Sequence, residues 1–330
     1  MAAAWHLARR HIDTVVLEAD IIGQGASGRT GGLVLEGTAW GAKSGADRCV
    51  PALAQLIQEA KLDCDLSLPG GWEIAHSGDS SGEPLPWRDD NRGVRIAHMV
   101  TGGTVEPMKL LTQLARAAAR AGAIIHEHAR VLRIVQEPRP TVELSGALIQ
   151  PRFVIVAVNA WTSDLLPNVR PLQSALTFAC ATEPLSKSVL EEIGLGAGIP
   201  FYTVDTPYLW GRISDEGRVI FGSGLTYDTA KRLENVAIDG AEPASTLARL
   251  EARVRGLHPA LREVHITHRW AGPIAIPQGG VPLVGSHPRA SILLVAGGYA
   301  GHGVALGPWM GQMMARSIAE AEPLPVWGKL

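Results

Sequence analysis

A glycine-rich strand-to-helix turn near the end of the chain limits the fold more than any other feature. An apolar run over residues 292–296 is followed by Gly298, and then Gly301 and Gly303 bracket His302 before a helical pattern starts. Glycines at such a turn let the backbone come close to a flat or anionic ligand, and the free N–H groups at the helix start point at that ligand. The turn therefore predicts one half of a ligand-binding site.

The N-terminal part of the chain has a matching pattern. Residues 14–18 form a β-type run that ends in Glu18, between a helical stretch over 2–10 and a loop over 23–32 that is rich in glycine. Many strands end in an acid, so Glu18 alone is equally well explained as a solvated terminal charge. In a dinucleotide fold, however, the second strand ends in an acid that binds the ribose hydroxyl groups. Together the two ends of the chain predict the two halves of a dinucleotide site.

Composition and charge exclude several classes of partner. The 330 residues provide enough chain for one large domain or two ordinary ones. The 30 lysines and arginines nearly balance the 32 aspartates and glutamates, which argues against a nucleic-acid-binding surface. The three cysteines form no C-x-x-C pair, as expected for buried thiols in a reducing cytoplasm. Apolar runs such as 153–158 are too short to cross a bilayer, and we expect neither a membrane nor a targeting segment.

Periodicity predicts an α/β part built from both ends of the chain. A helix over 108–121 has leucines at core spacing and ends at Gly122, and the fully apolar run 153–158 is typical of a parallel strand. Residues 51–61 also form a helical pattern, and 131–135 a strand pattern.

The interior of the chain predicts a separate, mostly antiparallel β-sheet. Strand patterns cover 176–182, 208–213, 218–222 and 265–270, with a helix over 243–257 among them. The polar segment 77–91 is expected to be a surface loop. We therefore expect an α/β fold with a Rossmann-like nucleotide-binding domain and an inserted substrate-binding domain. The first comprises residues 1–50, 101–170 and 271–330, and the second comprises 51–100 and 171–270.

Longer motifs identify a family. They are Ala3-Ala-Trp-His-Leu-Ala-Arg-Arg with Val15-Val-Leu-Glu-Ala-Asp, the loop 23–32, Gly103-Thr-Val-Glu-Pro107, Ile155-Val-Ala-Val-Asn-Ala-Trp161, Trp270-Ala-Gly-Pro-Ile and Gly298-Tyr-Ala-Gly-His-Gly-Val-Ala-Leu306. In this order they resemble the D-amino acid oxidase/sarcosine oxidase family of FAD-dependent oxidoreductases, and most closely its γ-glutamylputrescine oxidase-like members. The loop resembles the family's G-x-G-A-S-G-R-N-G-G pattern, with Thr30 in place of the usual Asn. The resemblance covers nearly the whole chain.

The resemblance implies a cofactor role for residues near the N-terminus. Glu18 would bind the adenosine ribose, and Val131 would meet the adenine through its main chain. The loop would lie against the pyrophosphate and the flavin, where backbone N–H groups and a cation suit an anion. Ser27, Gly28 and Arg29 would make these contacts, while Gly31 and Gly32 would let the isoalloxazine ring pack on bare backbone. No cysteine stands where covalent attachment would be expected, so the FAD is expected to be non-covalent.

The C-terminal turn and the inserted sheet would surround the reacting part of the flavin. Gly301, His302 and Gly303 would sit at its pyrimidine end, where a helix N-terminus favours negative charge, with Gly298 and Val304 in the same turn. The alternative for His302 is a histidine that caps the helix. Tyr208 and Trp210, with Arg212 on the same strand, would line the substrate pocket. Their alternative is one ordinary face of a sheet.

Two departures from the family pattern bear on the substrate. Amino-acid-oxidising relatives place an Arg just after the W-x-G unit to clamp a carboxylate, and here residues 271–277 contain none. Sarcosine-oxidising relatives carry a Lys soon after G-H-G, where this chain has Val304-Ala-Leu. Both departures favour a small-molecule amine or γ-glutamyl amine as substrate. No third ligand accompanies His126 and His128, or His265 and His268, so no metal site is expected.

The resemblance also implies that one element is missing. Roughly fifteen family residues, a central strand and its G-x-G-x-x-G turn, would precede Met1. Either the start is assigned too far downstream, or the chain is a fragment that retains FAD poorly. Three other functions remain open: an amino-acid oxidase or dehydrogenase of the same family, an inactive remnant, and an NAD-binding protein. The second glycine-rich turn argues against NAD, because a simple NAD fold needs no cradle there.

Overall fold

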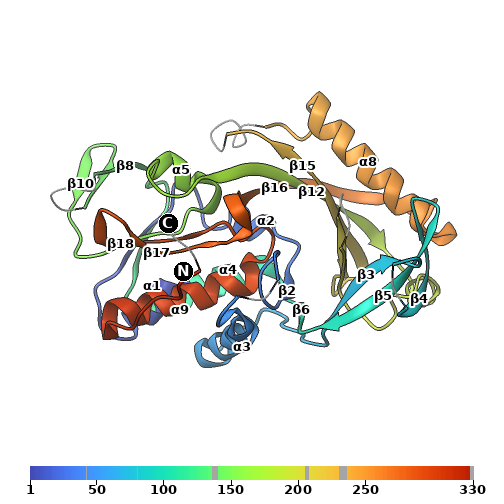
Figure 1. Cartoon of the computed structure of the whole chain (residues 1–330), viewed down its shortest axis with the longest axis horizontal. Helices are drawn as coiled ribbons and strands as arrows, with labels where there is room; N and C mark the ends of the chain where they lie inside the picture. The colour runs from blue at the N-terminus through green and yellow to red at the C-terminus, as the bar shows by residue number, and fades with distance from the viewer. Residues whose placement is uncertain (42, 80, 136–139, 205–207, 230–235, 328–330) are drawn as a thin grey trace.

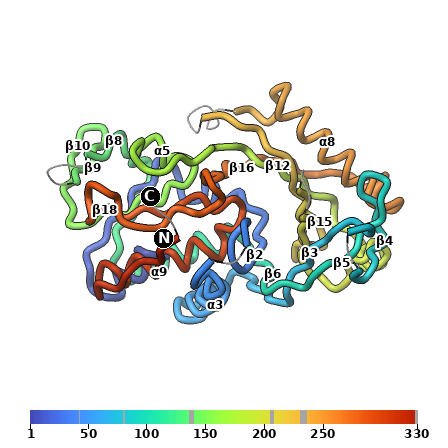
Figure 2. Tube along the Cα trace, in the orientation of Figure 1, coloured from blue at the N-terminus to red at the C-terminus, as the bar shows by residue number. Residues whose placement is uncertain are grey.

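The computed structural model describes residues 1–41, 43–79, 81–135, 140–204, 208–229 and 236–327. Figure 1 shows two parts side by side, a mixed α/β part that contains both termini and a lobe built on a large sheet. The trace in Figure 2 passes between the two parts along β12 and β16. The predicted combination of a Rossmann-like part and an inserted β-rich lobe is thus confirmed. No helix in the described ranges is both long and apolar enough to cross a bilayer.

Four helices form the main core of the α/β part. They are α1 (Ala2–Ala8), α3 (Cys49–Ala60), α4 (Pro107–Arg120) and α9 (Gly303–Glu320). Proline at the first position of α4 suits a helix start, and Gly122, with φ +109°, follows its end as predicted. α9 packs against α1, and Gly311 allows this approach because a β-carbon there would lie 2.8 Å from the backbone nitrogen of Ala3.

The parallel strands of the α/β part lie in two separate groups. β1 (Val15–Leu17) pairs with β7 (Ile124–His126), and β11 (Val154–Val156) pairs with β18 (Ala290–Gly297), which also pairs with the antiparallel β17 (Leu283–His287). The prediction of a parallel strand within 153–158 is confirmed. β1 and β11 each keep one edge that pairs with no described strand, and both strands line the same cavity. The α/β part therefore contains two separate pieces of sheet, each with one parallel pair of strands, and both pieces border this cavity.

Smaller elements complete the α/β part. The additional strands are β2 (Leu33–Leu35) with β6 (Gly102–Thr104), and the sheet of β8 (Val131–Val135), β9 (Thr141–Leu144) and β10 (Ala147–Ile149). The short helices are α2 (Ala26–Arg29), α5 (Thr162–Leu165), η1 (Ala46–Arg48), η2 (Asn159–Trp161) and η4 (Gln278–Gly280).

An eight-stranded sheet forms the lobe, in the order β16-β12-β15-β14-β13-β3-β5-β4. Its strands are β3 (Gly71–His76), β4 (Glu83–Asp89), β5 (Arg92–Val100), β12 (Leu172–Pro184), β13 (Phe201–Thr203), β14 (Leu209–Ile213), β15 (Arg218–Tyr227) and β16 (Ile266–Pro277). The neighbours are antiparallel except for β13 and β3, so the predicted mostly antiparallel sheet is confirmed. The helices α6 (Lys187–Glu192), α8 (Ala241–Leu257) and η3 (Pro259–Leu261) accompany the sheet.

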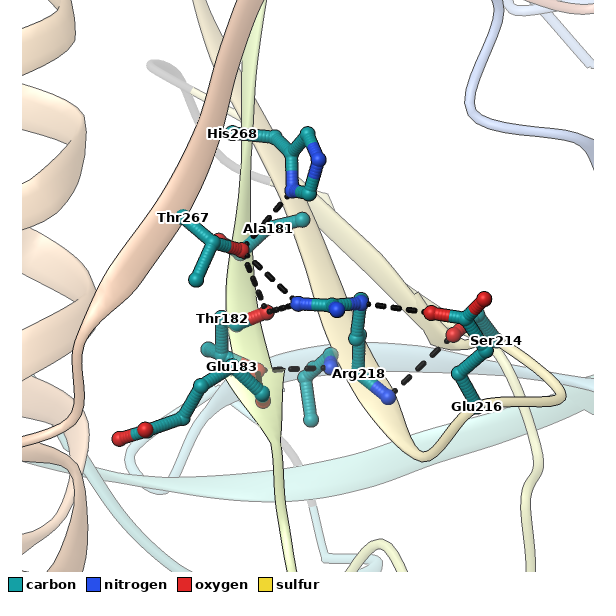
Figure 3. A network of polar contacts seen from close by, with 9 residues as sticks. Ala181, Thr182, Glu183, Ser214, Glu216, Arg218, Thr267 and His268 are labelled. Atoms are coloured by element: carbon teal, nitrogen blue, oxygen red, sulfur yellow. Dashed lines mark hydrogen bonds and ion pairs between the residues drawn. The ribbon is translucent and has the colours of Figure 1, made fainter.

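A polar network joins three strands at one end of this sheet (Figure 3). The guanidinium of Arg218 on β15 donates to the Thr182 carbonyl on β12 at 3.1 Å and to the Thr267 hydroxyl on β16 at 3.0 Å. It also pairs with Glu216 at 2.8 Å. The Thr182 hydroxyl accepts from the Val219 N–H at 3.0 Å. These bonds satisfy polar groups where the regular pairing of β12 with β15 is interrupted.

Two expectations from the sequence differ from the structure. The predicted loop over 77–91 is wrong in part, because Glu83–Asp89 forms the edge strand β4, in which Leu85 and Trp87 are buried. Prolines at positions 84 and 86 suggested a loop, but an edge strand tolerates them since its outer N–H groups need no partner. The predicted boundary at residue 51 assigns α3 to the substrate-binding domain, whereas Leu53 and Leu56 on α3 pack in the core with α9.

Candidate active site

One cavity of about 2520 Å³ brings together residues from both ends of the chain and from the lobe. Glu18 and His302, which belong to opposite termini, both line it. The predicted site residues in its wall are Glu18, Ser27, Arg29, Gly31, Val131, Tyr208, Trp210, Gly301, His302, Gly303 and Val304. Gly28, Gly32 and Gly298 lie outside the described lining.

The acid at the end of β1 is held by the backbone beside it. The N–H of Glu18 donates to the His126 carbonyl at 2.9 Å, which continues the pairing of β1 with β7. One carboxylate oxygen of Glu18 accepts from the Asp20 N–H at 3.0 Å. A second carboxylate oxygen remains to accept a ligand hydroxyl, since an ionised carboxylate has several acceptor sites.

The glycine-rich loop is fixed to the lobe by hydrogen bonds from two side chains. Arg29 donates to the Ala271 carbonyl at 3.4 Å, and the Trp270 indole N–H donates to the Arg29 carbonyl at 3.0 Å. Gly28 has no room for a side chain, because a β-carbon would lie 2.2 Å from the Gly23 carbonyl oxygen. The loop therefore has a defined position relative to the cavity.

The structure gives a different reason for two glycines of this loop. The resemblance implied that a flavin ring packs directly on the backbone at Gly31 and Gly32, where no side chain is present. A β-carbon at Gly31 would instead meet the Trp210 indole at 2.1 Å, and one at Gly32 would meet the Val105 carbonyl at 2.2 Å. Protein atoms already occupy these two positions, although other atoms of Gly31 still face the cavity.

At the C-terminal turn the backbone leaves space open. Gly301 has φ +96°, and nothing lies within 4 Å of the position that its β-carbon would take. The Gly298 N–H donates to the Asn159 side-chain carbonyl at 2.9 Å, which holds the turn against the end of β11. His302 occupies the N-cap position of α9 without a side-chain cap hydrogen bond, so the capping alternative finds no support here. Its Nδ1 is buried and has no partner among the described residues.

The lobe contributes an aromatic wall. The hydroxyl of Tyr208 shares a hydrogen bond of 2.7 Å with Thr177, and burial raises the pKa of this tyrosine. Arg212, which the sequence placed beside Tyr208 and Trp210 in the pocket, is not in the described lining. Its guanidinium is 5% exposed, pairs with Glu106 at 2.7 Å and also donates to the Gly31 carbonyl. Arg212 is thus a buried tie between the lobe and the loop.

Two wall residues were not predicted from the sequence. Glu73 on β3 and Tyr202 on β13 line the cavity, and the Tyr202 hydroxyl donates to Glu73 at 2.9 Å. Neither strand was expected, so nothing in the sequence pointed to these side chains.

His302 gives a prediction of pH dependence. Burial lowers its pKa from the ordinary 6.5 to about 4. Between these two values the unfolded chain holds a proton that the folded chain lacks, so stability falls as the pH drops from about 6.5 towards 4. Urea unfolding without added FAD should show this dependence of the unfolding free energy on pH. In His302→Gln the slope should be smaller by the amount that corresponds to about one bound proton. His6, whose pKa burial also lowers to about 4, keeps its own contribution in both proteins. Equal slopes for the two proteins would contradict the prediction.

Comparison with known proteins identifies the family. The family model described as FAD dependent oxidoreductase (DAO) matches residues 1–317. The chain is 25% identical over 376 aligned positions to "Gamma-glutamylputrescine oxidoreductase" of Escherichia coli (strain K12), covering 100% of this chain and 84% of that protein. Its fold is similar to glycine oxidase from Geobacillus kaustophilus, with a TM-score of 0.75, 20% identity and coverage of 97% of this chain and 91% of that one. It is also similar to L-proline dehydrogenase from P. horikoshii, with a TM-score of 0.73, 17% identity and coverage of 97% and 90%. Because the family model spans nearly the whole chain, this protein belongs to the DAO family of FAD-dependent oxidoreductases, and its cofactor is FAD.

Proposed function

We propose that this protein oxidises the C–N bond of an amine or γ-glutamyl amine, with hydride transfer to flavin N5 and oxygen as the electron acceptor. The observation that carries the proposal is the composition of the wall of this cavity. Glu18 and His302 lie on the side formed by the two ends of the chain. The part of the wall that comes from the eight-stranded sheet contains mostly aromatic and apolar side chains, with Glu73 as its one charged group and no described Arg or Lys. Such a wall offers no clamp for the carboxylate of a simple amino acid. The name of the relative in Escherichia coli agrees with this choice of substrate.

The residues present fit a bound FAD. The free carboxylate oxygen of Glu18 would accept from the ribose, and the loop with Arg29 would lie near the pyrophosphate. The open backbone at Gly301 and the start of α9 would face the pyrimidine end of the ring, where the helix N-terminus favours negative charge. The unpartnered Nδ1 of His302 would find a hydrogen-bond partner there. When bound, the flavin supplies the redox step by accepting hydride from the carbon beside the amine nitrogen.

The protein's own groups would hold and shield the substrate. Burial raises the pKa of Tyr208, so its phenol stays protonated and, with Thr177, can orient the amine. Trp210 and Trp270 exclude water from the wall beside the loop. His302 is neutral near pH 7 because burial lowers its pKa to about 4, so its role is a hydrogen bond and not a positive charge. We also infer that the reaction takes place in the cytoplasm, where the three free, buried cysteines would stay reduced.

Flavin spectroscopy tests the proposal. The protein is mixed with FAD, freed of unbound cofactor by gel filtration and titrated anaerobically with butylamine, 1,4-diaminobutane, a γ-glutamyl diamine, glycine and alanine. We expect a bound-flavin spectrum that bleaches faster with the amines than with either amino acid, and that returns when air is admitted. Faster bleaching by glycine or alanine would favour the amino-acid oxidase. A colourless protein, or one that no substrate bleaches, would favour the inactive remnant. Failure to reoxidise in air would point to another electron acceptor.

A further inference from the structure

A single row of neighbouring residues crosses the lobe sheet beneath the cavity. Register partners on six adjacent strands connect Glu73 on β3 with Trp270 on β16. The members of the row, in order, are Glu73, Tyr202, Trp210, Gly222, Ala179 and Trp270. Direct cross-strand partners project from the same face of a sheet, and all of these residues except Gly222 line the cavity. The row therefore presents three aromatic rings and ends in a carboxylate.

Glu73 is held in place, and none of the described residues neutralises it as a buried cation. One carboxylate oxygen accepts from Tyr202 at 2.9 Å. The other lies 3.9 Å from Nε2 of His98, whose side chain is 73% exposed, whereas that of Glu73 is 24% exposed. Burial, with a further contribution from Glu73, raises the pKa of Tyr202, so the phenol remains a donor. The carboxylate thus has a fixed direction and keeps acceptor capacity for another group.

The charge of the wall points to a cation. Glu73 is the one charged side chain that the eight-stranded sheet contributes to the described lining. Of the nearby cations, Arg29 lies on the loop and donates to a backbone carbonyl, and Arg212 is paired with Glu106 away from the cavity. A carboxylate beside aromatic faces attracts an ammonium group, both by its charge and by the cation–π interaction. The eight-stranded sheet contributes no Arg or Lys to the described lining that could bind a carboxylate.

We propose that Glu73, oriented by Tyr202, binds a second ammonium group of the substrate, distant from the C–N bond that is oxidised. This inference rests on the proposed amine oxidation and makes Glu73 a specificity-determining residue for diamines over monoamines. The spacing agrees with it. Trp210 touches the glycine-rich loop at Gly31, and Glu73 lies two strands away, which corresponds to about 10 Å. A substrate of several methylene groups spans the wall between a reacting amine near the loop and an ammonium at Glu73.

The test compares Glu73→Gln with the unchanged protein on two substrates of equal chain length. With 1,4-diaminobutane we expect KM to rise at least tenfold while kcat stays within twofold, because the lost charge anchors the substrate without taking part in the reaction. With butylamine we expect both constants to stay within twofold. Glu83 is an exposed carboxylate on β4 outside the described cavity lining. Glu83→Gln is therefore the matched control and should leave KM and kcat unchanged for both substrates. Unchanged constants for the diamine, or an equal loss for both amines, would overturn the proposal.

Calorimetry separates this inference from the proposed oxidation. Under anaerobic conditions, 1,4-diaminobutane should bind the protein at least tenfold more tightly than it binds Glu73→Gln, whether or not any amine reduces the flavin. If no amine bleaches the flavin but this difference persists, the oxidation is wrong and the ammonium site stands. If amines bleach the flavin but the two proteins bind the diamine equally, the oxidation stands and the ammonium site is wrong.

Discussion

Replacing Glu106 with Gln is expected to lower the free energy of unfolding by about 3 kcal/mol, the lower end of the range for breaking a buried ion pair. The Arg212 side chain is only 5% exposed, so the substitution leaves its guanidinium in the interior without a counter-ion. The 29% exposure of Glu106 keeps the expected effect at the low end of that range. Urea unfolding measures it as a shift of the midpoint at unchanged slope.

A surface pair of the same chemistry provides the control. Glu143 pairs with Arg133 at 2.8 Å, but the arginine is 68% exposed, and such pairs contribute about 0–1 kcal/mol. Glu143→Gln should therefore change stability much less than Glu106→Gln. An equal loss of stability in the two variants would contradict the prediction, because it would mean that Arg212 does not depend on Glu106 as its counter-ion. A further check is Arg212→Met combined with Glu106→Gln, which removes the stranded charge and should recover part of the loss.

Adding one methyl group at Gly222 should damage both stability and activity. The Trp210 indole lies close to two glycines: a β-carbon at Gly222 would fall 2.0 Å from one of its ring atoms, and one at Gly31 would fall 2.1 Å from another. We expect Gly222→Ala to cost about 1–3 kcal/mol, as overpacking does. Displacement of the ring into the cavity should lower kcat/KM for an amine at least tenfold.

A second substitution separates crowding from other effects of this change. The double variant with Gly222→Ala and Trp210→Leu exchanges the large ring for a smaller side chain, so it should be more stable than Gly222→Ala alone. Gly78→Ala tests the same exchange at a glycine that has open space and no unusual φ, and it should be nearly neutral. A double variant that is less stable than the single one would show that the ring is not crowded.

Features that depend on local chemistry were predictable from the sequence. The turn around His302 was predictable because positive φ angles, such as the +96° of Gly301, favour glycine. α4 was predictable because its apolar spacing and the glycine after it act over a few residues. The strand at 153–158 was predictable because an unbroken apolar run suits a strand that is buried on both faces.

Features that depend on pairing between segments far apart in the chain were not predictable from the sequence. β3 and β13 pair with each other although they are far apart in the sequence, with Phe201 opposite Trp72 in a parallel register. Neither segment carries an alternating pattern strong enough to indicate a strand. The position of Glu73 in the cavity wall follows from that register and therefore could not be predicted. The direction of Arg212 depends on Glu106, which lies on another element more than a hundred residues away.

The pairing of β12 with β16 has a consequence for how substrates enter. The two strands stay hydrogen-bonded from Leu172 opposite Pro277, beside the core of the α/β part, to Thr182 opposite Ile266, in the core of the lobe. A ladder of this kind, interrupted only by a register shift between Ala181 and Thr182, resists bending, so a hinge between the two parts would have to break it. Access to the cavity is then expected to come from local opening of surface segments at its mouth, and not from separation of the two parts as rigid bodies.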